Sequence, residues 1–258
     1  MNIQEHNSAA WDKAVDEADK WTLPVSSDVI ERARLGDWQV ILTPEKPVPR
    51  DWFGDIAGKE ILCLASGGGQ QAPILAAAGA NVTSFDNSAK QLEQDKFVAD
   101  RDGLNIRIEK GDAADLSRFA DASFDLVLNP CSNLFMPDLE PVWRECFRVL
   151  RPGGHLLAGI LKPVVFVFDR FEEETNKRLV IRHSIPYSDA ESLTANELAN
   201  LIEQGEPLEY SHTLEEQIGG QIDAGFYITG FYEDYWPKSD NLLTEYLPPF
   251  IATRALKP

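Results

Sequence analysis

A strand, a run of small residues, a helix and a second strand follow one another between residues 60 and 86. The first strand is apolar from Ile61 to Leu64, and the small residues run from Ala65 to Gly69. Glycines remove the Cβ atoms that would keep backbone N–H groups away from a ligand, and a helix N-terminus adds partial positive charge there. An acid at the end of the second strand is placed to accept hydrogen bonds from a ribose diol. The unit predicts a site for an adenosine-type ligand.

Strand and helix patterns alternate from residue 60 to residue 161. We predict strands at 60–64, 81–85, 106–110, 124–128 and 155–161, and helices at 72–78, 90–100 and 139–150. Such alternation is typical of a parallel sheet with helices on both faces. Ligands of these sheets lie at the carboxyl ends of the strands.

The flanking segments have other patterns. Residues 1–58 are rich in tryptophan and proline, with helices predicted at 8–17 and 27–35, so this leader is expected to pack on the core. After the core at 59–161, two strands (163–168 and 179–183) and a helix (194–204) form an insertion, 162–210. Residues 211–258 resume the core pattern with a capping box at Thr213 and Glu216, a helix to Ile222, and strands at 226–231 and 250–256.

Charge and composition exclude several functions. The 258 residues carry a net charge of −18, which would repel nucleic acids and anionic membranes. No apolar run approaches the length of about 20 residues that spans a bilayer, and the polar start differs from a signal peptide, so we expect a cytoplasmic protein. The three cysteines, Cys63, Cys131 and Cys146, are widely spaced, which favours structural thiols over a disulfide framework or a metal site.

Taken alone, the glycine run is ambiguous, because Gly67, Gly69 and Ala72 also fit the G-x-G-x-x-G/A spacing of an NAD-binding turn. Three later segments distinguish the cofactors. Residues 111–113 follow the third strand, where Asp112 can accept a hydrogen bond from an adenine amino group. Residues 124–127 open the fourth strand, and residues 148–154 form a turn into the fifth.

In order and spacing these segments resemble the class I S-adenosylmethionine-dependent methyltransferases, especially the small-molecule branch of ubiquinone and menaquinone biosynthesis. The resemblance covers residues 60–161 and, more loosely, the closing strands. It implies an α/β Rossmann-like fold: a mostly parallel seven-stranded sheet with helices on both faces, an N-terminal lid (1–58) and an inserted substrate cap (162–210). It also implies S-adenosylmethionine as cofactor and S-adenosylhomocysteine as product.

The resemblance also implies residue roles. Residues 65–69 would hold the methionine end of the cofactor, Asp86 the ribose hydroxyls, Asn87 the edge of the adenosine, and Asp112 with its neighbour the adenine ring. Asn129 would lie beneath the sulfonium. The full set of expected cofactor-binding residues is Trp21, Ala65, Ser66, Gly67, Gly68, Gly69, Gln70, Asp86, Asn87, Gln91, Asp112, Ala113 and Asn129.

The chain departs from the family pattern at two positions. Cys63 stands where the first strand usually carries an acid, and Ala65 stands where the first glycine of the motif is expected. The usual acid helps to organise the ammonium group of the cofactor. We therefore expect another carboxylate, a backbone carbonyl or water to take its place.

Methyl transfer from a sulfonium makes a dedicated base optional, so a catalytic residue is hard to identify. His212, at a predicted helix start, is a weak catalytic candidate and is otherwise a neighbour of a helix cap. Tyr187, His212, Tyr235 and Trp236 are the expected acceptor contacts, since aromatics suit an apolar small molecule.

Other functions stay open at this point. A NAD(P)-dependent oxidoreductase is one alternative, although the chain lacks a Tyr-x-x-x-Lys pair, and a non-catalytic S-adenosylmethionine-binding protein is another. The expected partner is a small-molecule methyl acceptor, and we expect a monomer or a homodimer. The pattern leaves the acceptor and the methylated atom undetermined.

Overall fold

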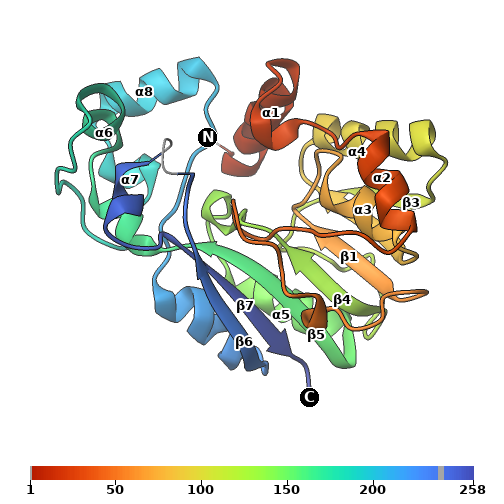
Figure 1. Ribbon diagram of the computed structural model, residues 1–258. Coiled ribbons are helices and arrows are strands. Elements are labelled where there is room, and N and C mark those ends of the chain that lie inside the picture. Colours follow the sequence, from red (N-terminus) through yellow and green to blue (C-terminus); the bar gives the residue numbers. More distant parts are fainter. Residues whose placement is uncertain (1, 238–240) are drawn as a thin grey trace.

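The computed structural model describes residues 2–237 and 241–258. Its centre is a seven-stranded sheet in the order β3-β2-β1-β4-β5-β7-β6 (Figure 1). The strands are β1 Glu60–Leu64, β2 Asn81–Asp86, β3 Ile106–Lys110, β4 Phe124–Asn129, β5 Leu150–Leu161, β6 Tyr227–Asp234 and β7 Phe250–Leu256. Strands β1 to β5 pair in parallel, and β7 runs antiparallel to both of its neighbours. The predicted mostly parallel, Rossmann-like sheet is confirmed.

Helices cover both faces of the sheet, and the central strand β1 has apolar side chains that pack on each face. Ile61 and Cys63 join a core cluster with residues of α2 and α3, whereas Leu62 and Leu64 join a second cluster with residues of α5. The α-helices are α1 Ile3–Asp16, α2 Ser27–Arg34, α3 Gln71–Ala77, α4 Ala89–Asp102, α5 Glu140–Val149, α6 Arg170–Asn176, α7 Asp189–Ser192, α8 Ala195–Gln204 and α9 Gly220–Asp223. Shorter turns are the 3₁₀ helices η1 Lys20–Thr22, η2 Arg50–Trp52, η3 Asn133–Phe135, η4 Pro163–Val167 and η6 Leu242–Glu245, and the π-helix η5 Glu215–Gly219.

Several predicted elements differ from the structure. The predicted strand 163–168 is wrong, since this segment forms η4, and the predicted strand 179–183 makes only the isolated bridge Phe168–Ile181. Val164 to Val167 favour a strand by propensity, but Pro163 suits the first turn of a helix, and Phe166 packs into a third core cluster with Tyr187 and Phe250. Helix α1 begins five residues earlier than expected, and so does β5, which includes residues 150–154 of the turn predicted at 148–154.

The predicted capping box at Thr213 is present. The Thr213 N–H donates to Glu216 Oε2 at 2.6 Å, and the Glu216 N–H donates to Thr213 Oγ1 at 3.1 Å. The helix that it starts is the π-turn η5, which continues into α9.

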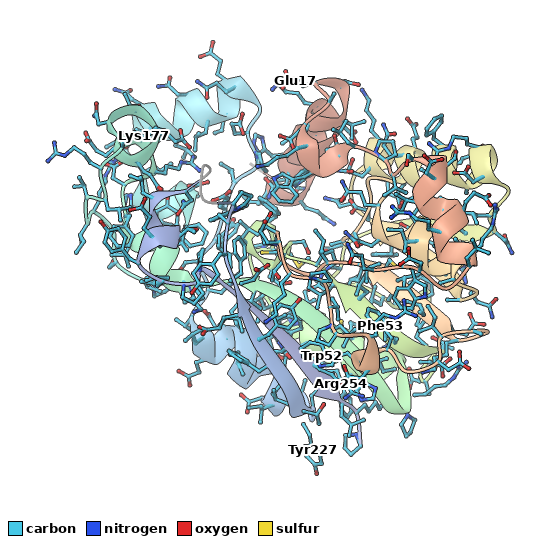
Figure 2. The ribbon with its side chains drawn as sticks, in the orientation of Figure 1. Glu17, Trp52, Phe53, Lys177, Tyr227 and Arg254 are labelled. Atoms are coloured by element: carbon cyan, nitrogen blue, oxygen red, sulfur yellow. The ribbon has the colours of Figure 1, made fainter. Side chains whose placement is uncertain are left out.

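Helix α1 and the helices of segment 162–210 lie at one end of the sheet in Figure 1. Figure 2 marks the two ends of the molecule: Glu17 follows α1 at one end, and Tyr227 begins β6 at the other. Trp52 and Phe53, near η2, are buried against the sheet. None of the described helices is long and apolar enough to cross a membrane, and no His, Cys, Asp or Glu side chains of the described residues form a group of three that could hold a metal ion.

Candidate active site

A cavity of about 740 Å³ lies at the carboxyl ends of the parallel strands. Its floor includes Ala65 directly after β1, Asp86 at the end of β2, Gly111 after β3, Pro130 after β4 and Leu161 at the end of β5. Its walls come from α1 on one side and from segment 162–210 on the other. The cavity therefore occupies the place where a sheet of this kind binds its ligands.

The glycine run is tied to the protein through its own N–H groups. Gly67 donates to Asp86 Oδ2, Gly68 to the Gln91 carbonyl and Gly69 to Asp95 Oδ1, each at 2.9 Å. The expectation that these N–H groups would point at a ligand is therefore wrong. They hold the loop against β2 and α4 instead.

Asp95 is the buried anchor of this loop. Its side chain is fully buried in α4, and its second oxygen accepts the Ser84 hydroxyl at 2.6 Å. Burial raises the pKa of Asp95 to about 7, against the opposing effect of these two hydrogen bonds. The sequence offered no signal for this role, because an acid within a helix reads as part of a solvated face.

Residues 21–25 of the N-terminal segment pack so closely on Gly68 and Gly69 that a side chain at either position would collide with them or with Gln91. A Cβ on Gly69 would lie 2.6 Å from Pro24 Cβ, and a Cβ on Gly68 would lie 3.2 Å from the Trp21 carbonyl. The Val25 N–H also donates to the Gly69 carbonyl at 2.9 Å. The two glycines thus let residues 21–25 approach the loop backbone closely.

The departure at Ala65 has a conformational cost. Ala65 has φ +47°, a left-handed conformation that is unfavourable for any residue with a Cβ. Ala65→Gly is therefore expected to raise the free energy of unfolding by about 1 kcal/mol, as measured by urea denaturation. Ala78 has φ −77°, so the control Ala78→Gly should lower it. An unchanged or lowered value for Ala65→Gly would contradict the conformational account.

The other departure, Cys63, lies outside the site. Its side chain is fully buried in the cluster beneath α3, and burial raises the pKa of the thiol well above its usual value. Such a thiol is inert and makes no contact with the cavity. The carboxylates that do line the cavity include Asp19, Asp86 and Asp112.

Buried polar atoms near the loop lack hydrogen-bond partners among the described residues. They are Ser66 Oγ, Gln91 Oε1 and Asn129 Oδ1. Ser66 and Gln91 line the cavity, so a polar ligand there would satisfy atoms that are costly to leave unpaired. Asn129 lies just behind them, with its amide donating to the Leu64 carbonyl at 3.1 Å.

The carboxylates of the cavity have defined surroundings. Asp86 accepts the N–H groups of Gly67 and Ser88, and burial raises the pKa of its carboxyl above the ordinary value. Asp112 Oδ1 accepts the Ala114 N–H at 3.0 Å. A Cβ on Gly111 would lie 2.4 Å from the Phe85 ring, so this glycine keeps the third strand end close to that ring.

The acceptor candidates separate into two groups. Tyr187 and Trp236 line the cavity, although the Tyr187 hydroxyl is already committed to Asp189 Oδ1 at 2.6 Å. His212 does not line the cavity, and its ring Nε2 lies 2.7 Å from the Met136 carbonyl oxygen. Tyr235 is 46% exposed and also lies outside the cavity lining.

The structure brings most of the predicted site residues together. The predicted residues that line the cavity are Trp21, Ala65, Ser66, Gly67, Gln70, Asp86, Asn87, Gln91, Asp112, Ala113, Tyr187 and Trp236. The predicted residues outside its lining are Gly68, Gly69, Asn129, His212 and Tyr235. The sequence reasoning missed Arg170 and Glu209, which line the cavity from segment 162–210, and the buried Asp95.

Comparison with known proteins bears on the family. Residues 62–158 match the family described as a methyltransferase domain. The uncharacterized methyltransferase YbaJ of Bacillus subtilis is 52% identical, over 98% of this chain and 97% of YbaJ.

The chain belongs to the class I S-adenosylmethionine-dependent methyltransferases.

More distant matches agree with this family. The sterol 24-C-methyltransferase erg6 of Aspergillus fumigatus is 38% identical over 38% of this chain and 26% of erg6. The crystal structure of an S-adenosylmethionine-dependent methyltransferase from Mesorhizobium loti shares the fold, with a TM-score of 0.61 and 19% identity over 80% of this chain and 94% of that one. Membership of this methyltransferase family decides between the two candidate cofactors in favour of S-adenosylmethionine.

Proposed function

We propose that this methyltransferase transfers the methyl group of S-adenosylmethionine to a small-molecule acceptor held between α1 and segment 162–210. The observation that carries the proposal is the cavity itself: one continuous space reaches from the ends of β1 to β4 to the aromatic side chains of that segment. Small-molecule sites are typically of this size and character.

Each part of the cofactor would have its own contacts. Asp86 would bind the ribose hydroxyls, Asp112 and Ala113 the adenine, and Ser66 and Gln91 the polar groups nearest the loop. When bound, S-adenosylmethionine supplies a methyl group on an already activated sulfonium. The task of the protein is then to position the acceptor in line and to exclude water, which α1 and segment 162–210 would do as lid and cap.

A thermal-shift comparison tests the cofactor assignment. S-adenosylmethionine and S-adenosylhomocysteine should each raise the melting temperature, whereas NAD and NADP should leave it unchanged. Stabilisation by NAD or NADP alone would contradict the proposed function. Formation of S-adenosylhomocysteine when S-adenosylmethionine is supplied with fractions of a metabolite extract would separate an enzyme from a cofactor-binding protein without activity.

Asp86→Ala tests the ribose contact. We expect S-adenosylhomocysteine to bind 10- to 100-fold more weakly, equivalent to about 1–3 kcal/mol, because charge-assisted hydrogen bonds are lost. Calorimetric titration measures this. Asp100→Ala is the matched control, since Asp100 is an exposed acid of α4 paired with Lys96, and it should leave the affinity unchanged. An unaltered affinity for Asp86→Ala would refute the ribose assignment.

A further inference from the structure

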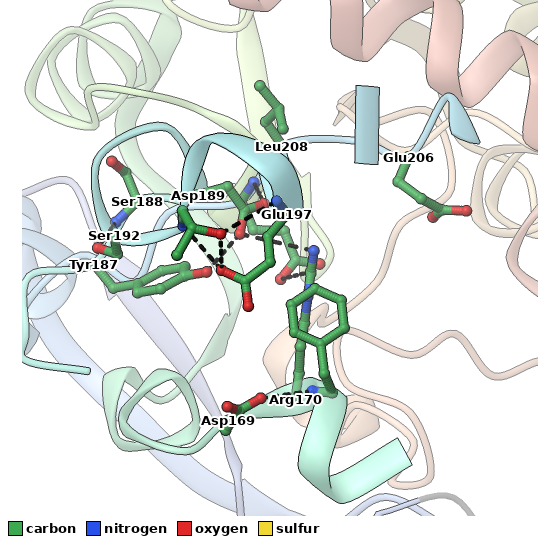
Figure 3. A network of polar contacts seen from close by, with 12 residues as sticks. Asp169, Arg170, Tyr187, Ser188, Asp189, Ser192, Glu197, Glu206 and Leu208 are labelled. Carbon is green, nitrogen blue, oxygen red and sulfur yellow. Dashed lines mark hydrogen bonds and ion pairs between the residues drawn. The ribbon is translucent and has the colours of Figure 1, made fainter. Parts of the chain in front are cut away.

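One wall of the cavity carries a cation between two acids. Arg170, the first residue of α6, extends toward Asp189 (Figure 3) and is also paired with Glu209. Its Nη2 lies 3.9 Å from Asp189 Oδ1, and its Nη1 lies 3.9 Å from Glu209 Oε2. Both distances are those of ion pairs and exceed the length of a hydrogen bond.

Asp189 already has its partners. Its Oδ1 accepts the Tyr187 hydroxyl at 2.6 Å, and its Oδ2 accepts the Glu209 N–H at 2.8 Å. The side chain is fully buried. Asp189 therefore fixes the positions of Tyr187 and of the Glu209 backbone, and it serves the architecture of segment 162–210.

Arg170 and Glu209, in contrast, have side-chain atoms that can still form hydrogen bonds with a ligand. Arg170 Nη2 is buried without a hydrogen-bond partner in the described part of the chain, and the guanidinium carbon lies 5.2 Å from the centre of the Phe171 ring. A buried donor without an acceptor is unfavourable, and a guanidinium has five donors to satisfy. Both residues line the cavity, so a ligand there can meet a donor and an acceptor side by side.

The surrounding charge determines which ligand fits. Asp189, Glu174 and Glu206 act on Glu209 in addition to Arg170, and burial raises the pKa of the Glu209 carboxyl to about 7. A carboxylate ligand would face these acids, and an ammonium ligand would face Arg170. A hydroxyl group carries no charge, and it both donates and accepts a hydrogen bond.

We propose that Arg170 and Glu209 bind a neutral hydroxyl group of the methyl acceptor, an alcohol or a phenol. The Arg170 guanidinium donates a hydrogen bond to the hydroxyl oxygen, and the Glu209 carboxylate accepts a hydrogen bond from the hydroxyl group. The apolar remainder of the acceptor lies against the neighbouring side chains that line the same space, which include Leu161, Phe166, Phe168 and Trp236. This inference rests on the proposed function and specifies its acceptor class.

The test uses four probes with one ring system. They are 2-naphthol, 2-methoxynaphthalene, 2-naphthoate and 2-naphthylmethylammonium, each titrated into the full chain saturated with S-adenosylhomocysteine. We expect 2-naphthol to bind at least fivefold more tightly than each of the others. Tighter binding of the carboxylate or the ammonium probe, or binding of none of the four, would overturn the proposal.

Two variants test whether Arg170 and Glu209 cause the tighter binding of 2-naphthol. Arg170→Met and Glu209→Met should each reduce the advantage of 2-naphthol over 2-methoxynaphthalene to less than twofold, while S-adenosylhomocysteine affinity stays unchanged. Arg178→Met, just past the end of α6, and Glu203→Met, on the exposed side of α8, lie outside the cavity lining, so they are the matched controls and should keep the advantage.

Two readouts keep the outcomes distinct. Should Arg170→Met unfold, Glu209→Met still decides, because this change of similar size removes the acceptor oxygens from a side chain whose only contact given for the described residues is the 3.9 Å ion pair. An advantage of 2-naphthol that survives in Glu209→Met would overturn the hydroxyl site. Failure of the wild type to bind S-adenosylhomocysteine would instead contradict the proposed function.

Discussion

Asp95→Ala is expected to lower the free energy of unfolding by about 3 kcal/mol, because the Gly69 N–H and the Ser84 hydroxyl each lose a buried acceptor. S-adenosylhomocysteine should also bind more than tenfold more weakly, since the loop that carries Ser66 is no longer held against α4. Urea denaturation and calorimetric titration measure the two effects. Asp95→Asn keeps an oxygen for the Gly69 N–H and should retain most of both properties. Wild-type stability in Asp95→Ala would show that the loop is held by other contacts.

Asp95 also predicts a pH dependence. Its pKa is about 7 in the folded chain and near the ordinary value of 3.8 when unfolded, so the folded state binds the proton more strongly. Stability from this group is therefore present at low pH and falls as the pH rises from about 4 to about 7. Urea denaturation at pH 5 and pH 8 should show a smaller decrease for Asp95→Asn than for the wild type. Equal decreases would assign the pH dependence to other groups.

Asn7→Ala is expected to release α1 from the cavity. The Asn7 amide donates to the carbonyls of Phe135 at 3.1 Å and Leu208 at 3.0 Å, and its oxygen accepts the Leu208 N–H at 2.8 Å. One buried side chain thus joins α1 to η3 and to the end of segment 162–210. Its removal should destabilise the docked helix by about 3 kcal/mol, because buried backbone groups lose their partners.

Hydrogen–deuterium exchange of the α1 amides measures this release, and protection should fall strongly in Asn7→Ala. S-adenosylhomocysteine affinity should fall about tenfold, since α1 forms one wall of the cavity. Glu17→Ala, at the exposed end of α1, is the control and should change neither quantity. Full protection of α1 in Asn7→Ala would contradict the proposal that α1 is a lid held by this residue.

The sheet was predictable because its signals are local. Each parallel strand is a short apolar run bounded by turn residues, and the apolar residues of β1 alone predict burial on both faces. The residues at or just after the strand ends, such as Asp86 and Asp112, were predictable for the same reason, since parallel strands bring their carboxyl ends to one edge. The segment 162–183 was not, because its valines have strand propensity while Pro163 and the packing of Phe166 favour a helical turn.

The glycine run shows where sequence reasoning stops. Its position after β1 was enough to predict the place of the site, and the later segments were enough to predict the family. The sequence alone also determined the two unusual positions, Cys63 and Ala65. Only the tertiary structure showed that the N–H groups of the run are bound by Asp86, Gln91 and Asp95, and that Cys63 is buried away from the cavity.

One physical reason explains both what the sequence predicted and what it did not. Periodicity and turn residues act between neighbours in the chain, so the sequence by itself determined the seven strands of the sheet, the sheet class and the end of the sheet where the cavity lies. Hydrogen bonds between distant residues depend on the packed fold. Asn7 with Leu208 is such a pair, and the ion pair of Arg170 with Glu209 depends on the packed fold in the same way, so only the tertiary structure decided which side chains surround the cavity.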